Sequence, residues 1–443
     1  MRALTRSIDL PHATAMVAGT IIGASIFVQP SEVSRAVPGF GGMLLVWIAA
    51  GALTWFGASI CAELSSAFPQ TGGVYVFVRQ VLAPAAGFLW GWAMFWSMHS
   101  GIIAAIAVVF SRYAAKVVPA GDAGIRGMSV GAIVALSAVN YMGVRLGSAV
   151  QAGLTVIKVF AIAILLAVLF GAGASHLPAL SAGVGARGFL RAVVAGLFAF
   201  GGWHMVTYAA EETGDPRRTI PRALMLGTAI VVVVYLALNA AYLLVLPLDR
   251  VLTSSSIAAD AASAVAGPAA ATAISVLVAI SALGAMSGII LAGPRVYYAM
   301  ACDGLFFGWM AAVHPRFRTP YRAIIAQAIW SSVLVLTGTY RSLFTRVVYT
   351  EWIFFGALAL GVMRMRRSPD YRPTFRAWGF PIAPLLFTAG CAAIVANQIA
   401  TEPIESATGL ALAAAGVPVY YYWSRAAAAR GRRLTRGAVD ARG

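Results

Sequence analysis

Charged residues are scarce in this sequence. Only 11% of its 443 residues are Asp, Glu, Lys or Arg, whereas 60% are hydrophobic. Apolar runs of about twenty residues, the length that a helix needs to cross a bilayer, recur along the chain. This composition excludes an ordinary soluble globular protein. Because the runs lack the alternating pattern of barrel strands, we expect helices, which satisfy their backbone groups internally.

Cysteine and histidine are also rare, and motifs for nucleotides or metals are missing. The three cysteines, Cys61, Cys302 and Cys391, lie in or beside separate apolar segments without metal-site spacing, so they imply neither a disulfide framework nor a metal site. No phosphate-binding G-x-x-x-x-G-K-[ST] loop is present, so ATP is not expected to drive this protein. We expect no enzymatic activity and no cofactor. The alternative from a different class is a membrane redox protein, with haem ligated by His99 and His204.

The basic residues indicate how the chain lies in the membrane. The net charge of +17 is typical of nucleic-acid-binding proteins, but all except two of the 32 basic residues are arginines that lie mostly in short connections between apolar runs. We therefore expect no nucleic-acid partner. We predict twelve membrane spans, at 10–35, 41–67, 84–111, 127–144, 149–172, 188–210, 222–247, 269–300, 321–338, 343–363, 379–400 and 406–423.

The distribution of charge between these connections predicts the orientation. The N-terminus, the even-numbered connections and the C-terminal tail hold 22 Lys and Arg residues, Arg295 included, against nine in the odd-numbered connections. The richer side is cytoplasmic, so both termini are expected inside the cell. The first segment shows no cleavage site and is expected to stay in the protein. A high ratio of Arg to Lys and abundant Ala are typical of a GC-rich prokaryote, which predicts a bacterial inner membrane.

Two of the predicted spans contain glycine near their middle. "IIGASIF" lies in span one and "FAFGGWH" in span six, about 180 residues later, and each of these spans is followed by four more. A broken helix is tolerated at membrane depth only where it is buried or lines a cavity, and paired breaks in two repeats indicate a transporter site. Freed N–H groups favour a carboxylate, and freed carbonyls favour an ammonium. The alternative is close helix packing, which Gly19 and Gly23 also fit at their four-residue spacing.

Several longer stretches carry a resemblance to a known family. "GTIIGASIF", "GALTWFGASICAELSSAFPQTGGVYVFVR", "LFAFGGWHMVTYAAEETGDPRRTIPRAL", "PRVYYAMACDGLFF", "HPRFRTPYRAII" and "RRSPDYRPTFRAWGFPIAPLL" together resemble the amino acid-polyamine-organocation (APC) superfamily, closest to its L-type amino acid transporter branch. The resemblance implies an all-α membrane protein with two inverted five-helix repeats plus two further helices. It also implies a secondary transporter of amino acids that works by alternating access.

This resemblance divides the chain into five parts. They are a cytoplasmic N-terminus at 1–9, a first repeat at 10–173, a second, inverted repeat at 188–363, helices eleven and twelve at 379–423, and a basic tail at 424–443. The tail is expected to be solvated or to lie on lipid headgroups. Animal relatives of the L-type branch are linked to a partner through a cysteine between spans three and four. This chain has no cysteine between Ser111 and Gly127, so we expect no disulfide-linked partner subunit.

The resemblance also implies the substrate-binding residues, position by position. Where the family usually reads G-S-G-I-F, this chain reads "GASIF", so Ser25 adds a side chain to the expected cradle for the carboxylate. Phe198 matches an aromatic residue that gates the site in the family, although an isolated phenylalanine in such a chain is more often an ordinary core residue. The expected substrate-binding residues are Ile21, Gly23, Ala24, Ser25 and Ile26 in span one, and Phe198, Ala199, Phe200, Gly201 and Trp203 in span six.

Lys158 lies in the middle of span five, where a cation is costly unless it is partnered. It resembles a lysine of sodium-independent family members, whose ammonium occupies the place that a sodium ion fills in relatives, near spans one and eight. A proton-coupling group is a second interpretation, because burial disfavours the charged form of a lysine. The third is a side chain that reaches an interface.

The remaining polar residues leave the transport cycle open. The expected site contains no Asp, Glu, Lys or Arg, which predicts neutral L-amino acids as substrates. His204 either faces the substrate or hydrogen-bonds inside the bundle, and His99 and Glu351 have no assigned role. Glu63 and Arg79 are candidates for a cytoplasmic ion pair. Exchange and proton coupling both remain possible, and neither the particular amino acid nor the oligomeric state follows from the sequence.

Overall fold

The structure is a computed structural model that describes residues 8–70, 72–173, 185–338 and 340–425. Within these ranges the chain is almost entirely helical, and extended pairing is limited to one isolated bridge between Ile8 and Thr213. The expected all-α class is therefore confirmed for the described chain.

The first part of the chain consists of eight α-helices and two short irregular turns. Long apolar stretches form its main helices, and proline is the first or second residue of three of the elements, where the missing N–H costs nothing. The elements are α1 (Leu10–Ile21), the 3-10 turn η1 (Ala24–Phe27), α2 (Gln29–Ala36), α3 (Phe40–Ala67), α4 (Val74–Val81), α5 (Pro84–Ala93), the π-helical turn η2 (Met94–Met98), α6 (His99–Ala114), α7 (Asp122–Tyr141) and α8 (Val144–Gly171).

The second part continues with a further broken helix and several long helices. Its elements are α9 (Ala186–Ala199), the 3-10 segment η3 (Trp203–Glu212), α10 (Pro216–Val245), α11 (Leu248–Thr253), α12 (Ile257–Cys302), the 3-10 turn η4 (Gly308–Ala311), α13 (Tyr321–Thr337), α14 (Tyr340–Met365), α15 (Ile382–Thr401) and α16 (Pro403–Ala414). Gly267, with φ of 79°, interrupts the helical geometry inside α12, directly before Pro268.

Eight helices of the described chain are long and apolar enough to cross a membrane, judged by length and composition. Two further apolar helices, Ile157–Gly171 and Tyr321–Thr337, are shorter. The structure thus supports a multi-pass membrane protein, while the count of twelve spans and the repeat arrangement stay predictions. Some predicted boundaries are displaced: the predicted span 269–300 is the second part of α12, because helical structure continues on both sides of the Gly267 kink.

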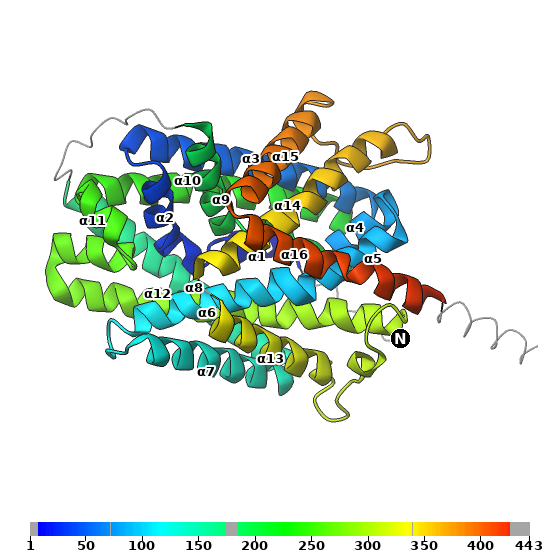
Figure 1. The fold of residues 1–443 in the computed structure, drawn as a ribbon, viewed down its shortest axis with the longest axis horizontal. Coiled ribbons are helices and arrows are strands. Elements are labelled where there is room, and N and C mark those ends of the chain that lie inside the picture. Colours follow the sequence, from blue (N-terminus) through cyan, green and yellow to red (C-terminus); the bar gives the residue numbers. More distant parts are fainter. Residues whose placement is uncertain (1–7, 71, 174–184, 339, 426–443) are drawn as a thin grey trace, which may run out of the picture.

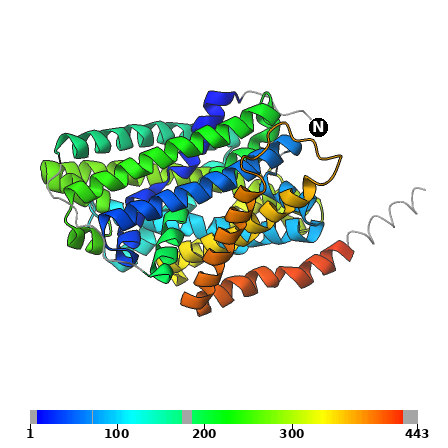
Figure 2. The ribbon, with the colours of Figure 1, turned by 90° about the horizontal axis from the view of Figure 1, so that it is seen from above.

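The long helices form a bundle around the two broken ones. α6, α7, α12 and α13 run side by side in Figure 1, and each of them contacts the other three. α10 packs against both α1 and α3, and α14 packs against α15. α16 lies at the edge of the bundle in Figure 2, where it contacts α14, α15 and α5. The breaks in α1–η1 and α9–η3 are therefore enclosed by other helices.

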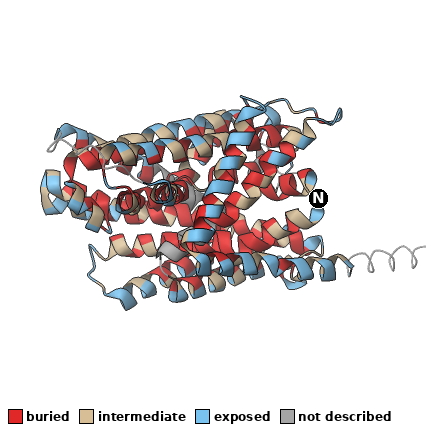
Figure 3. Cartoon of the chain, turned by 45° about the horizontal axis from the view of Figure 1, so that its top comes forward, coloured by how far each residue is buried: buried red, intermediate tan, exposed pale blue. Residues whose placement is uncertain are grey.

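Burial supports a lipid-facing exterior. Buried residues fill the centre of the bundle in Figure 3, and exposed residues follow its outer faces. Many exposed residues are large and apolar, for example Phe160 on α8, Val233 on α10 and Ile382 on α15, which are 64%, 67% and 66% exposed. Such continuous apolar exposure suits a hydrocarbon environment and not water.

Candidate functional site

The first break separates α1 from η1. α1 ends at Ile21, and Gly23 is extended, with φ of −95° and ψ of −169°. The N–H of Gly23 donates to the carbonyl of Ile21 at 2.6 Å, so it no longer bonds four residues back to Gly19. The turn η1 then starts at Ala24, and its first N–H groups have no acceptor within the turn. The predicted interruption of this helix is confirmed.

The second break separates α9 from η3, and it touches the first. α9 ends at Ala199, and Gly202 adopts the left-handed conformation with φ of 93°. A Cβ atom at Gly202 would lie 3.0 Å from the carbonyl oxygen of Thr20, so both the conformation and the close approach of α1 require glycine. The hydroxyl of Thr20 lies 3.2 Å from the carbonyl oxygen of Gly202 and 2.9 and 3.0 Å from those of Met16 and Val17, and it can donate its one hydrogen to any of the three. The prediction of a second interruption is also confirmed.

Tyr235 on α10 connects the two breaks from behind. Its hydroxyl lies 2.9 Å from the carbonyl oxygen of Ile21 and 3.0 Å from that of Ala199, and it can donate its one hydrogen to either. Both carbonyls belong to the last residue of a helix that stops inside the bundle. Buried carbonyls of this kind need a partner, and Tyr235 lies within hydrogen-bond distance of both, while the carbonyl of Ile21 also accepts from the N–H of Gly23. Sequence reasoning missed this residue, which lies in an otherwise apolar stretch of span seven.

A small, largely enclosed cavity of about 30 Å³ lies where the breaks meet. Its lining includes five of the residues expected to bind substrate: Ile21, Gly23, Ser25, Phe198 and Gly201. The remaining wall is mostly apolar and comes from α6, α9, α12 and α14, with Ile102, Ile106, Leu197, Ile289 and Val348. The structure therefore brings half of the expected residues together around one space.

The other five expected residues lie beside this cavity and do not line it; they are Ala24, Ile26, Ala199, Phe200 and Trp203. Phe200 is buried and packs against Tyr235, with ring centroids 4.9 Å apart. Trp203 is buried against Phe355 of α14, at a centroid distance of 4.8 Å. Their substrate contacts remain predictions, which would require the site to open further.

Glu351 on α14 lines the same cavity, which the sequence analysis did not predict. Its side chain is only 5% exposed, and its Oε1 atom has no hydrogen-bond partner among the described residues. The expectation that no acidic side chain lies at the site is therefore wrong. The pattern did hold a signal, because an ionisable residue in the middle of an apolar span is by default a functional candidate.

Lys158 on α8 reaches the first break from the other side. The lysine is almost completely buried, and its Nζ donates to the carbonyl oxygen of Gly19 at 2.6 Å. In a continuous helix this carbonyl would accept from the N–H of Gly23, which bonds elsewhere. The break thus creates the acceptor that Lys158 uses. The predicted position beside span one agrees with this contact, while the role of the ammonium stays a prediction.

The two histidines named in the haem alternative are both fully buried, and neither has a ring nitrogen with a hydrogen-bond partner in the described chain. His204 is enclosed by aromatic rings, including those of Trp90, Trp203 and Phe355 at centroid distances of 5.9, 5.4 and 5.4 Å. This packing leaves no space for a porphyrin beside His204. No group of three or more potential metal ligands gathers anywhere in the described residues.

A larger cavity, of about 560 Å³, lies on the other side of Thr20 and Met205, which line both cavities. We call it the vestibule. Arg79 and Asp303 lie at its wall, 4.0 Å apart, on segments that the charge distribution predicts to be cytoplasmic. Thr20 and Met205 therefore separate the central cavity from the vestibule.

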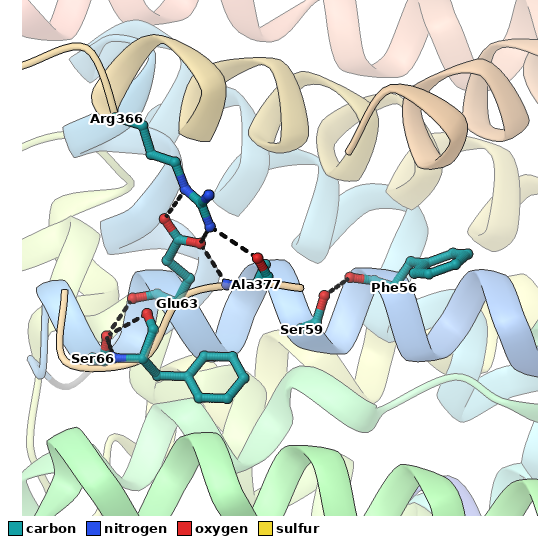
Figure 4. Close-up of polar contacts among 7 residues, drawn as sticks. Phe56, Ser59, Glu63, Ser66, Arg366 and Ala377 are labelled. Carbon is teal, nitrogen blue, oxygen red and sulfur yellow. Dashed lines mark hydrogen bonds and ion pairs between the residues drawn. The ribbon is translucent and has the colours of Figure 1, made fainter. Parts of the chain in front are cut away.

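Glu63 does not pair with Arg79, as the sequence suggested, but with Arg366 (Figure 4). One carboxylate oxygen accepts from Nε of Arg366 at 2.8 Å, and the other accepts from a second guanidinium nitrogen and from the N–H of Ala377 at 2.8 Å. The hydrogen bond to the Glu63 carboxylate raises the pKa of Arg366. The pairing fastens the segment after α14 to the end of α3.

The same segment is held a second time, by Ser66. Its hydroxyl donates to the carbonyl of Glu63 at 2.8 Å and accepts from the N–H of Phe375 at 3.1 Å. Burial, with the nearby Glu63 carboxylate, raises the pKa of Tyr371. We call Glu63, Ser66, Arg366 and their backbone partners the loop clamp.

The fold and the site define a multi-pass helical membrane protein with a closed cavity between two broken helices, which is the arrangement of a secondary transporter. The family model for amino acid permeases matches residues 8–420. The chain belongs to this family, and thereby to the APC superfamily, as the sequence motifs predicted. Members of this family are transporters and not enzymes, which excludes the redox alternative.

Individual relatives match over most of their length. The chain is 29% identical to the serine/threonine exchanger SteT of Bacillus subtilis, over 94% of this chain and 97% of that protein. It is 30% identical to the large neutral amino acids transporter small subunit 2 of Rattus norvegicus, over 95% and 82% of the two chains. It is 27% identical to the human cystine/glutamate transporter, over 94% and 85%.

Proposed function

We propose that this protein is a secondary active transporter of neutral L-amino acids, which works by alternating access and without sodium. The observation that carries the proposal is the meeting of two helix breaks at one enclosed cavity. Backbone groups freed at a break can bind the two charges that every amino acid carries. The relatives are transporters or exchangers of amino acids by name, which supports the substrate class.

The two breaks offer opposite polarity to a substrate. η1 begins beside the cavity with N–H groups that lack acceptors within the turn, and they suit the α-carboxylate. α9 ends beside the cavity and directs its carbonyl end there, which suits the α-ammonium. The substrate side chain would then lie near Gly201, which lines the cavity and has no side chain of its own.

The difference between the two cavities supports alternating access. The central cavity, at about 30 Å³, has room for roughly a water molecule. An amino acid can therefore enter or leave only if the walls separate. Because Thr20 and Met205 lie between this cavity and the vestibule, we infer that η3 and α1 part there when substrate exchanges with the cytoplasm. Phe198 is the proposed gate residue at the cavity itself.

Lys158 supports the proposal of sodium independence. A sodium ion would need carbonyl oxygens at the first break, and the ammonium of Lys158 already occupies the carbonyl of Gly19. A fixed positive charge at this place also disfavours a second cation.

We further propose twelve spans in two inverted five-helix repeats plus two helices, with both termini in the cytoplasm of a bacterial cell. One relative is named as a small subunit, which indicates an assembly with another chain for that protein. For this chain we propose no disulfide-linked partner, because no cysteine lies between Ser111 and Gly127.

Counterflow in proteoliposomes tests the proposed function. The purified protein is reconstituted with unlabelled serine or alanine inside, and uptake of the labelled amino acid is followed from a sodium-free solution. We expect uptake that unlabelled neutral amino acids suppress more strongly than arginine or glutamate does. Failure of every common amino acid to exchange would contradict the proposal, and equal suppression by charged amino acids would contradict the neutral preference.

A further inference from the structure

Glu351 is the acidic group of the central cavity, and its surroundings do not stabilise a negative charge. The carboxyl is buried, its Oε1 has no partner among the described residues, and the cavity wall near it is mostly apolar. An unpaired carboxylate in such a place is strongly disfavoured compared with the neutral acid. The closed cavity therefore requires either a proton on Glu351 or a cation beside it.

No other side chain provides that cation in the described chain. Lys158 is held by the carbonyl of Gly19 and forms no ion pair with Glu351. Arg79 lies at the vestibule wall, near Asp303, and Arg366 is bound by Glu63. Glu351 is thus distinct from the paired acidic groups elsewhere in the bundle.

Among the residues that line the cavity, Glu351 is the only charged one. The charged groups on the elements around α14 are Glu63 on α3, Arg79 on α4, Arg112 on α6, Arg187 and Arg191 on α9 and Glu405 on α16, and none of them lines the cavity. The neutral titratable groups near α14 include His99 on α6, His204 and Tyr208 on η3, Cys61 on α3 and Cys391 on α15. Tyr208 lies within electrostatic reach of the carboxyl of Glu351. Both histidines are buried without a partner for either ring nitrogen in the described residues, which favours neutral imidazoles. None of these groups provides the positive charge that would stabilise an ionised Glu351 in place of a proton.

We propose that Glu351 binds the proton that crosses the membrane together with each neutral amino acid. This inference rests on the proposed function and decides between exchange alone and proton coupling. The carboxylate takes one proton from the aqueous side to which the cavity is open, and the neutral acid then allows the cavity to close. It releases the proton together with the amino acid when the cavity opens to the other side, and the unloaded transporter returns with water beside the carboxylate. No bond of the substrate changes, and one positive charge moves with each zwitterion.

The lining of the cavity favours a proton over a cationic side chain. The lining there consists of apolar residues, among them Val348 and Ile106, which offer no further acceptors to a guanidinium or ammonium group. The test therefore also measures the uptake of arginine.

The experiment compares Glu351→Gln with wild type in two assays on the same proteoliposomes. The first is counterflow at equal pH, which needs substrate exchange but no proton gradient. The second is net uptake of labelled alanine with the interior one pH unit more alkaline and the membrane potential held at zero. One proton per amino acid supports an accumulation of about tenfold under this gradient, because one pH unit is a tenfold ratio of proton activity.

We expect wild-type protein to accumulate alanine severalfold and to acidify the interior, as a trapped pH dye reports. Glu351→Gln should still perform counterflow, with an altered KM, but it should bring alanine only to equal concentrations and carry no protons. Glu402→Gln is the matched control, because it makes the same chemical change at a partly exposed ion pair with Arg191. It should behave as wild type in both assays.

Three results would overturn the inference. Accumulation that persists in Glu351→Gln would show that another group binds the proton, and loss of accumulation only in Lys158→Gln would assign the proton to Lys158. Wild-type uptake of arginine that Glu351→Gln abolishes would show that Glu351 binds a cationic side chain instead. Absence of counterflow in wild type, by contrast, would contradict the proposed function itself, so the two failures are distinguishable.

Discussion

Two buried glutamates in this bundle differ in how their charge is satisfied. Glu63, near the end of α3, is bound by two nitrogens of Arg366 and by the N–H of Ala377 in the loop clamp. Glu351, in the central cavity, has an oxygen without any partner in the described chain. The first arrangement suits a carboxylate that fastens a loop. The second suits a carboxyl group that binds and releases a proton during a transport cycle.

The comparison teaches that burial alone does not distinguish structure from function. Both side chains are removed from solvent, and both belong to apolar helices. The difference lies in their partners and in the adjacent space, since Glu351 borders the cavity between the two helix breaks. Substitutions at the loop clamp should therefore affect folding first, and substitutions near the cavity should affect transport first.

The largest effect is expected from Glu63→Ala. It leaves the guanidinium of Arg366 without its carboxylate and the N–H of Ala377 without an acceptor, and breaking one side of a buried pair costs about 3–5 kcal/mol. We expect a clearly lower unfolding temperature in detergent. Arg79→Ala is the control, because its partly exposed contact with Asp303 contributes at most about 1 kcal/mol. Equal unfolding temperatures for these two variants would contradict the proposed structural role of the loop clamp.

The pairing in the loop clamp also shows what sequence can and cannot predict. The helix breaks were predictable, because glycine in the middle of an apolar span is a local signal. The partner of Glu63 was not, because Arg366 is 303 residues away and Arg79 is the nearer basic residue along the chain. Glu351 was missed for a related reason: the rotation of α14 about its axis decides whether the side chain meets the cavity or lipid, and a span that is apolar on most sides does not define that rotation.

Lys158→Ala should affect transport more than folding. The change leaves the carbonyl of Gly19 without its donor, which costs about 1–3 kcal/mol, and it removes the ammonium from the first break. We expect a monodisperse protein with counterflow reduced about 5- to 150-fold, in accordance with that energy. Wild-type uptake should be the same in sodium and in choline solutions. A dependence of wild-type uptake on sodium would contradict the proposed role of Lys158.

Gly202→Ala should disturb the contact between the two breaks. Alanine is strained at φ of 93°, and its Cβ would meet the carbonyl oxygen of Thr20, at a combined cost of about 1–3 kcal/mol. We expect slower counterflow and a modest decrease in the unfolding temperature. Gly201→Ala is the neighbouring control, because φ of Gly201 does not lie in the left-handed region and its nearest atom would be the carbonyl oxygen of Phe198 at 3.2 Å. If Gly201→Ala unfolded earlier than Gly202→Ala, the assigned contact with Thr20 would be wrong.

The smallest effect on stability is expected from Glu351→Gln. This variant tests the difference between Glu351 and Glu63 most directly. If the carboxyl is neutral in the closed cavity, glutamine replaces it with nearly the same volume and charge, and no ion pair is lost. The free energy of unfolding should then change by less than about 1 kcal/mol at neutral pH, since no hydrogen bond is removed at Oε1. Glu63→Gln should cost more, because an amide replaces a carboxylate that binds Arg366. Thermal unfolding of the two variants at matched pH measures the difference. A strong destabilisation by Glu351→Gln would mean that the carboxylate has a partner in the folded protein and is structural, as Glu63 is.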